Sequence, residues 1–165
     1  MKHSVIIPLY NKARYVKRAI ESLLLQTKKP YEIIIVDDCS TDNSLLEVTA
    51  TLHNNRHLCR DITIRLIRME TNQGPGGARN RGLDEVQGEY VSCLDADDRY
   101  DLSYLQRADE VIKKWNVDVL FVGLHYEDSG VVWPHAKRVG ALAKEKEKGV
   151  YEIAHPSQAF VKGDV

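Results

Sequence analysis

The chain has 165 residues, 43% of them hydrophobic, which suits one domain with a sizeable core. Its formal net charge of -1 gives no reason to expect nucleic acid or a membrane surface as a partner. No apolar stretch reaches the roughly 18 residues that a membrane-spanning helix needs. The three cysteines are widely spaced and odd in number, which is typical of a reduced, cytoplasmic protein.

Short apolar runs alternate with helical patterns along most of the chain. Runs rich in β-branched residues predict strands at 4–9, 31–36, 62–69, 90–94 and 117–124. Apolar residues at helical spacing predict helices at 16–27, 45–48, 78–86 and 102–112. This order predicts an α/β fold with a mostly parallel sheet flanked by helices.

The pattern weakens after about residue 127. Residues 131–133 could form a short strand, and 141–148 a solvated loop or an exposed helix. The last residues, from Pro156 onward, have the pattern of the start of a helix. We therefore expect the end of the chain to be an incomplete part of the fold.

Polar side chains follow three of the predicted strands at the point where each strand ends. They are Tyr10 with Asn11, the pair Asp37-Asp38, and the turn Asp95-Ala-Asp97. In open α/β sheets, ligands bind outside the carboxyl ends of the strands. The sequence therefore predicts that these side chains converge on one crevice.

Each strand-end group has a binding interpretation and a structural one. Asp95 and Asp97 could hold a divalent cation through oxygen ligands, or form an acidic turn that caps the next helix. Asp38 could accept a hydrogen bond from a nucleobase, or serve as a helix cap. Ser40 or Thr41 is expected to supply that cap instead. Tyr10 could stack on a base, or simply pack.

A glycine-rich turn at 74–77 precedes the third predicted helix. It fails the dinucleotide fingerprint, which needs glycine where Arg79 stands, and the P-loop, which needs lysine where Leu83 stands. A helix amino terminus with Arg79 and Arg81 suits an anion such as a diphosphate, or the arginines are simply exposed. His53 and His57 have metal-ligand spacing but lie at a polar helix end, which favours a solvated surface.

Seven blocks within residues 3–100 resemble family 2 glycosyltransferases, in order. The blocks are Ser4-Val-Ile-Ile-Pro-Leu-Tyr-Asn11, Glu21-Ser-Leu-Leu-Leu-Gln26, Glu32-Ile-Ile-Ile-Val-Asp-Asp-Cys-Ser-Thr-Asp42, Asn72-Gln-Gly74, Ala78-Arg-Asn-Arg-Gly82, Gly88-Glu-Tyr-Val91 and Leu94-Asp-Ala-Asp-Asp98. The resemblance implies a GT-A fold, here truncated, and an enzyme that uses a UDP-linked or similar nucleotide-sugar donor and inverts the anomeric carbon. The acceptor would be a glycan or a lipid-linked sugar.

The resemblance also implies roles for the strand-end residues. Pro8 and Tyr10 would line the base pocket, and Asp38 would accept the uracil N–H. Arg79 would be either a donor contact or a structural helix residue.

A metal site is implied by the same resemblance. Asp95 would contact the ribose or the metal, and Asp97 would hold Mn²⁺ or Mg²⁺ on the diphosphate.

The resemblance divides the chain into a donor-binding domain at 1–125 and the start of an acceptor-side region at 126–165. The family's general base lies well beyond the D-x-D turn, so we expect it beyond Val165. Glu127-Asp128 is too close to match and is expected to be a loop.

Two other functions stay open. One is a nucleotide-sugar-binding module without turnover. The other is a nucleotidyltransferase, although its glycine-rich, lysine-bearing loop is absent where Tyr10-Asn-Lys-Ala stands.

Overall fold

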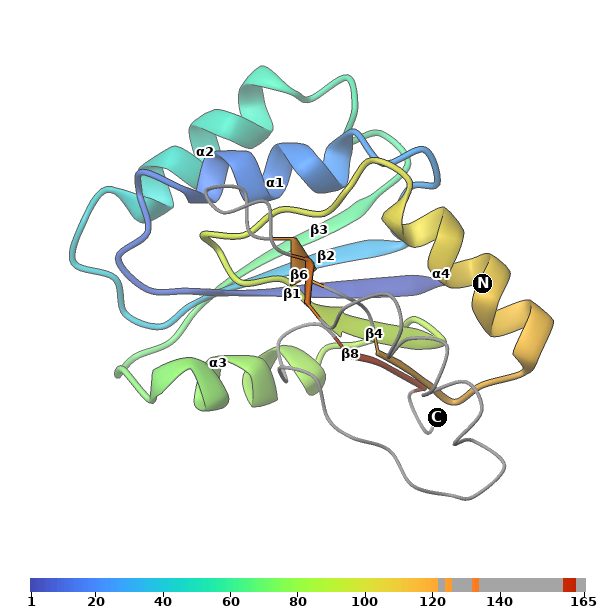
Figure 1. Cartoon of the computed structure of the whole chain (residues 1–165). Coiled ribbons are helices and arrows are strands. Elements are labelled where there is room, and N and C mark those ends of the chain that lie inside the picture. The colour runs from blue at the N-terminus through green and yellow to red at the C-terminus, as the bar shows by residue number, and fades with distance from the viewer. Residues whose placement is uncertain (122–123, 126–131, 134–158, 163–165) are drawn as a thin grey trace.

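A computed structural model describes residues 1–121, 124–125, 132–133 and 159–162 (Figure 1). Four helices and eight strands lie within these residues. The elements are β1 (His3–Leu9), α1 (Val16–Leu24), β2 (Glu32–Asp37), α2 (Ser44–Asn54), β3 (Thr63–Arg68), α3 (Gly74–Leu83), β4 (Tyr90–Cys93), α4 (Tyr104–Trp115), β5 (Val119–Phe121), β6 (Leu124–His125), β7 (Val132–Trp133) and β8 (Ala159–Lys162).

The main sheet has the strand order β3-β2-β1-β4-β8-β5. Strands β1 to β4 are parallel, and β8 runs antiparallel between β4 and β5. Leu9 pairs with Asp37 and Ile6 with Cys93, so β1, β2 and β4 end at the same edge. The predicted α/β fold with a mostly parallel sheet is confirmed.

Helices cover both faces of the sheet (Figure 1). Side chains of β1 and β2 alternate between two cores. Val5, Ile7 and Leu9 pack with residues of α1, α2 and α4 on one face. Ile6 packs with Ala78 of α3 on the other. Strands that are buried on both faces are expected to be continuously apolar, as the β1 and β2 runs are.

The helix α3 lies very close to β1. A Cβ atom added to Gly82 would come within 2.6 Å of the Ile6 Cγ2 atom, so a side chain at this position would push the helix away from the sheet. The first turns of α3 lie at the edge where the parallel strands end, because α3 follows the carboxyl end of β3.

Two predicted elements, the helix near residue 78 and the carboxyl-terminal segment, differ from the structure. The helix α3 begins at Gly74 rather than at Ala78, because Pro75 fits a first helical turn, where its missing N–H is not needed. Residues 159–162 form the strand β8, not a helix, because they pair with Val91 and with 119–121. The strand predicted at 131–133 is present as Val132–Trp133, and 141–148 lies outside the described residues.

Two structural findings bear on the composition. The helices that the structure describes include none with the length and apolar character needed to cross a bilayer. Cys39, Cys59 and Cys93 are free thiols.

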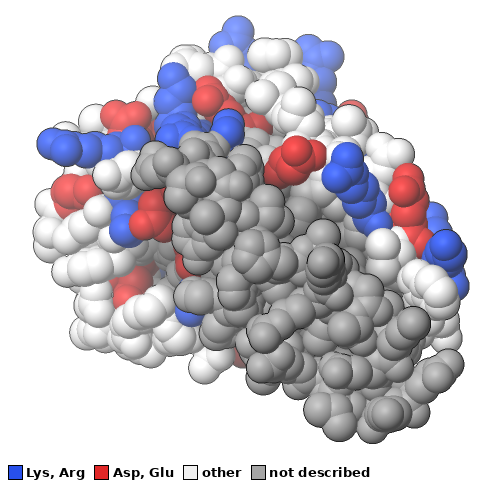
Figure 2. Space-filling view, viewed as in Figure 1, with Lys and Arg blue, Asp and Glu red and all other residues white. Residues whose placement is uncertain are grey.

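On the face shown in Figure 2, Lys and Arg side chains are interspersed with Asp and Glu over the described residues.

Candidate functional site

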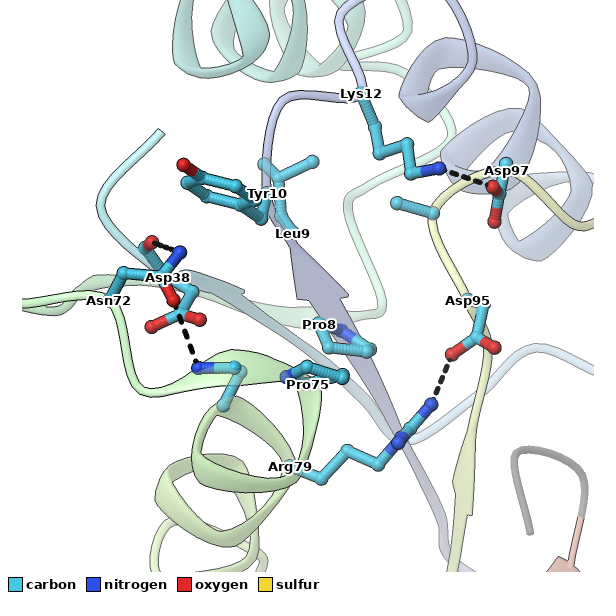
Figure 3. A pocket seen from close by; sticks show the side chains of 13 residues that line it. Pro8, Leu9, Tyr10, Lys12, Asp38, Asn72, Pro75, Arg79, Asp95 and Asp97 are labelled. Atoms are coloured by element: carbon cyan, nitrogen blue, oxygen red, sulfur yellow. Dashed lines mark hydrogen bonds and ion pairs between the residues drawn. The ribbon is translucent and has the colours of Figure 1, made fainter. Parts of the chain in front are cut away.

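A cleft of about 420 Å³ lies at the carboxyl ends of β1, β2 and β4, beside the start of α3 (Figure 3). Its walls come from four separate parts of the sequence. They consist of Pro8, Leu9, Tyr10, Lys12, Asp38, Asn72, Gly74, Pro75, Ala78, Arg79, Asp95, Ala96 and Asp97. The convergence predicted from the strand ends is therefore present in the fold.

Asp38 and Tyr10 form one side of this cleft (Figure 3). Asp38 is only 2% exposed, and its Oδ1 atom accepts a hydrogen bond of 2.8 Å from the backbone N–H of Gln73. Its own N–H donates to the Leu9 carbonyl, and its carbonyl accepts from the side chain of Asn72. The Asp38 carboxylate is thus fixed in place, whereas the Tyr10 ring is 44% exposed.

Asp37, the neighbour of Asp38, has a different role. Its side chain is fully buried; Oδ1 accepts the N–H of Ser40 at 3.2 Å, and Oδ2 lies 3.6 Å from the Arg68 Nε atom. Asp37 does not line the cleft, so among the two acids only Asp38 is available to a ligand there.

The loops after β1 and β2 are bound to each other through Asn11. Its backbone has a φ of 51°, a left-handed conformation that asparagine tolerates. Its Oδ1 atom accepts the N–H groups of Thr41 and Asp42, and its own N–H donates to the Ser40 hydroxyl. At the start of α2, Asp42 accepts the N–H of Ser44, in place of the Ser40 or Thr41 cap predicted above.

Both carboxylates of the Asp95-Ala-Asp97 turn are paired with basic side chains (Figure 3). The Arg79 Nη2 atom lies 2.7 Å from Asp95 Oδ1, and the Lys12 Nζ atom lies 2.5 Å from Asp97 Oδ2. The hydrogen bond to Asp97 raises the pKa of Lys12 and keeps this ammonium charged. Positive and negative groups therefore alternate along this side of the cleft.

Other candidate groups lie outside the cleft. Arg81 of α3 pairs at 2.6 Å with Glu85, which follows the helix, and His53 and His57 are exposed. Burial raises the pKa of Cys93 to about 11, so this thiol stays protonated at neutral pH and is a poor nucleophile. Within the described residues, no group of three or more His, Cys, Asp or Glu side chains could hold a metal ion.

All of the site residues predicted from the sequence line the cleft: Pro8, Tyr10, Asp38, Arg79, Asp95 and Asp97. Their individual roles stay predictions. The sequence reasoning missed Lys12 and Pro75 as lining residues. Lys12 could have been found, because it comes just after the end of β1 and so belongs to the edge where ligands bind.

Curated relatives match the chain over most of its length. A glycosyltransferase of Nostoc sp. is 45% identical over 117 residues, which are 71% of this chain and 34% of that protein. The poly(ribitol-phosphate) beta-N-acetylglucosaminyltransferase TarS of Staphylococcus aureus is 35% identical over 125 residues, covering 74% of this chain and 21% of TarS. The chain therefore spans about a third or less of the length of these two relatives.

Solved structures of a glycosyltransferase are also similar to this chain. The S. aureus TarS structure with UDP-GlcNAc has a TM-score of 0.69 and 27% identity, covering 96% of this chain and 51% of that one. The TarS structure with UDP has a TM-score of 0.64 and 35% identity, covering 73% of this chain and 35% of that one.

A more distant structure agrees in fold. The Pyrobaculum calidifontis mannosyltransferase PcManGT, in complex with GDP-Man and Mn²⁺, has a TM-score of 0.77 at 22% identity, covering 98% of this chain and 44% of that one. Finally, the family model described as Glycosyl transferase family 2 matches residues 4–162. The chain belongs to glycosyltransferase family 2.

Proposed function

We propose that this chain is the donor-binding part of an inverting, metal-dependent glycosyltransferase that moves a sugar from a UDP-sugar to a glycan or lipid-linked acceptor. One observation carries the proposal: the aromatic ring of Tyr10, the buried Asp38 and the acids Asp95 and Asp97 line a single cleft. The UDP and UDP-GlcNAc complexes of the relative TarS support the choice of nucleotide. A cytoplasmic location, either free or at the inner face of the membrane, is part of the proposal.

The base of the nucleotide would lie between Tyr10 and Asp38. A ring that is 44% exposed at the cleft offers a face on which a base can stack. A carboxylate accepts hydrogen bonds only, so Asp38 favours a base that presents an N–H, as uracil does. Because Gln73 donates to the Asp38 carboxylate and Asn72 donates to the Asp38 carbonyl, the orientation of Asp38 is fixed before a ligand arrives. Pro8 adds an apolar surface to the same pocket.

Mn²⁺ or Mg²⁺ fits the carboxylates of Asp95 and Asp97. Hard divalent cations take oxygen ligands, and Mg²⁺ is commonly bound by one or two carboxylates together with substrate phosphates and waters. Two carboxylates on one turn of the cleft match that arrangement without a third acidic or histidine ligand. When bound, such a cation would offset the charge on the diphosphate leaving group.

The chain's own residues would bind and orient the donor. Arg79, directed into the cleft from α3, could bind the diphosphate with a planar guanidinium that suits phosphate oxygens (Figure 3). Inversion also requires a base that removes the proton of the acceptor hydroxyl. We expect that base beyond Val165, so transfer is proposed for the whole protein and donor binding for this chain.

Calorimetry with UDP tests the proposal. UDP should bind more tightly with Mn²⁺ than without it, and Asp97→Ala should abolish that difference. Asp98→Ala is the matched control, because Asp98 is an exposed acid of the same turn that does not line the cleft. Mn²⁺-independent UDP binding, or equal losses in both variants, would remove the metal from the proposal.

A second experiment separates the enzyme from a binding module. A thermal-shift screen of nucleotide sugars with Mn²⁺ would identify the donor. Single-turnover transfer from that donor to any acceptor would then support an enzyme. Tight donor binding without transfer by the whole protein would support a non-catalytic nucleotide-sugar-binding module.

A further inference from the structure

Lys12 forms an ion pair with Asp97, one of the two carboxylates of the proposed metal site. Its ammonium lies 2.5 Å from Asp97 Oδ2, and it reaches that position from the loop after β1, which is 85 residues away in sequence (Figure 3). Both side chains are partly exposed, at 39% for Lys12 and 42% for Asp97, and both line the cleft. The ion pair is therefore open to a ligand that enters the cleft.

The backbone of Lys12 is fixed by hydrogen bonds, and its ammonium pairs with Asp97 and lies 5.9 Å from the centre of the Tyr15 ring. The Lys12 N–H donates to the Ser44 hydroxyl at 2.8 Å, and the next N–H, of Ala13, donates to Asp42 Oδ2 at 3.1 Å. Together with the contacts of Asn11, these bonds tie the loop to the start of α2. A lysine ammonium is carried on a flexible four-carbon stem. The Lys12 ammonium can therefore leave Asp97, but the fixed backbone keeps it within reach of the cleft.

The ammonium occupies Oδ2, one of the two Asp97 oxygens that a divalent cation could bind. A cation that binds this carboxylate is repelled by the ammonium, so metal binding is favoured when the ammonium moves away. A diphosphate in the cleft offers the displaced ammonium new oxygen partners. Metal alone thus meets competition at Asp97, whereas metal with nucleotide does not.

We propose that Lys12 is an internal counter-cation for Asp97 that passes to the donor diphosphate when metal and nucleotide bind together. This inference rests on the proposed function, since it needs a metal at Asp97. Lys12 then makes the binding of metal and nucleotide cooperative, and by linkage each ligand increases the affinity of the other by the same factor. The ion pair of Lys12 with Asp97 would keep a free divalent cation from occupying the cleft before the donor arrives.

Titrations of Mn²⁺ and of UDP test the inference with the 165-residue chain. Free Mn²⁺ is followed by its electron paramagnetic resonance signal, and UDP binding by calorimetry. Without nucleotide, Lys12→Met should bind Mn²⁺ up to about five-fold more tightly, the largest effect typical of a solvent-exposed ion pair. With Mn²⁺ present, the same variant should bind UDP about ten-fold more weakly, because a charged hydrogen bond to phosphate is lost.

Two further variants complete the design. Lys12→Arg keeps the charge and should retain the cooperativity between Mn²⁺ and UDP. Lys17→Met removes an exposed lysine of α1 that pairs with Glu21 and does not line the cleft, so its affinities should equal those of the wild type.

The outcomes separate the inference from the proposed function. If the wild type binds UDP with Mn²⁺ but Lys12→Met leaves both affinities unchanged, the inference is overturned and the metal site stands. If the wild type shows no effect of Mn²⁺ on UDP, the metal site and the inference both fail. Circular dichroism of Lys12→Met that matches the wild type ensures that a loss of binding is not a loss of fold.

Discussion

Arg79 and Asp95 are joined by an ion pair of 2.7 Å that links the helix α3 to the end of β4. The two side chains are 25% and 26% exposed, so the pair is partly open to the cleft. With Lys12 and Asp97, it gives the D-x-D turn two positive partners from two different elements. Each carboxylate of the D-x-D turn is therefore paired with one basic side chain.

This relationship predicts the effect of Arg79→Gln. We expect the variant to bind both UDP and pyrophosphate about ten-fold more weakly, because a charged hydrogen bond to the diphosphate is lost. The free energy of unfolding should fall by no more than about 1 kcal/mol, since the pair with Asp95 is partly solvated. Calorimetry and urea unfolding measure the two quantities.

Arg81→Gln is the matched control for Arg79. Arg81 is on the same helix but pairs with Glu85 and does not line the cleft, so neither affinity should change. A large loss of stability with normal pyrophosphate binding in Arg79→Gln would make Arg79 a structural residue.

Asp38→Asn separates base recognition from phosphate binding. The asparagine oxygen can still accept the N–H of Gln73, so the wall of the cleft should keep its shape. The amide nitrogen would meet the uracil N–H, donor to donor, if asparagine keeps that orientation. We expect UDP binding to weaken about ten-fold while pyrophosphate binding stays the same. Equal losses for the two ligands would remove Asp38 from the base pocket.

The strands and the strand-end acids could be predicted from the sequence because their signals are local. The run Val5–Leu9 is apolar throughout, since β1 is buried on both faces, and the acids at 37–38 and 95–97 lie at or just past strand ends. A parallel sheet then brings these ends to one edge by topology alone. That reasoning needed no knowledge of side-chain positions.

The features that were missed depend on distant parts of the chain. The strand β8 exists because Val161 pairs with both Val91 and Val119, and no local pattern reports those partners. The first turn of α3 contains Gly74, with a φ of 77°, and Pro75, both of which suggest a turn when tertiary contacts are unknown. The pairing of Lys12 with Asp97 likewise depends on where two loops meet.

The backbone conformation of Cys39 predicts a difference in stability between two substitutions at this position. Its φ of 62° lies in the left-handed region, where any side chain with a Cβ atom is strained. Glycine removes that strain and alanine does not, and both remove the weak contact of the thiol with the Glu70 carbonyl. We expect Cys39→Gly to be about 1 kcal/mol more stable than Cys39→Ala. Urea unfolding of the two variants measures the difference, and a more stable alanine variant would contradict the argument.

The ion pairs of Asp109 predict how the free energy of unfolding depends on pH. Its side chain, 9% exposed, lies 2.7 Å from Lys28, 2.9 Å from Lys113, 3.2 Å from His3 and 3.7 Å from the amino terminus. Burial acts to raise the pKa of Asp109, but the hydrogen bonds from these groups outweigh it and hold that pKa well below its ordinary value of 3.8. The folded state thus binds this proton more weakly than the unfolded state does.

A depressed pKa means that the stabilisation from Asp109 is complete above about pH 4 and is lost as the pH falls further. At pH 7, Asp109→Asn should lower the free energy of unfolding by about 1–2 kcal/mol, because Lys28 and His3 lose a charged partner. That deficit should begin to shrink between about pH 4 and pH 3, because the unfolded wild type takes up a proton at Asp109 in this range whereas the folded state does not. Thermal unfolding at a series of pH values measures both effects, with Glu110→Gln, an exposed acid of the same helix, as the control. A deficit that stays constant down to pH 3 would show that Asp109 stabilises α4 by packing and not by charge.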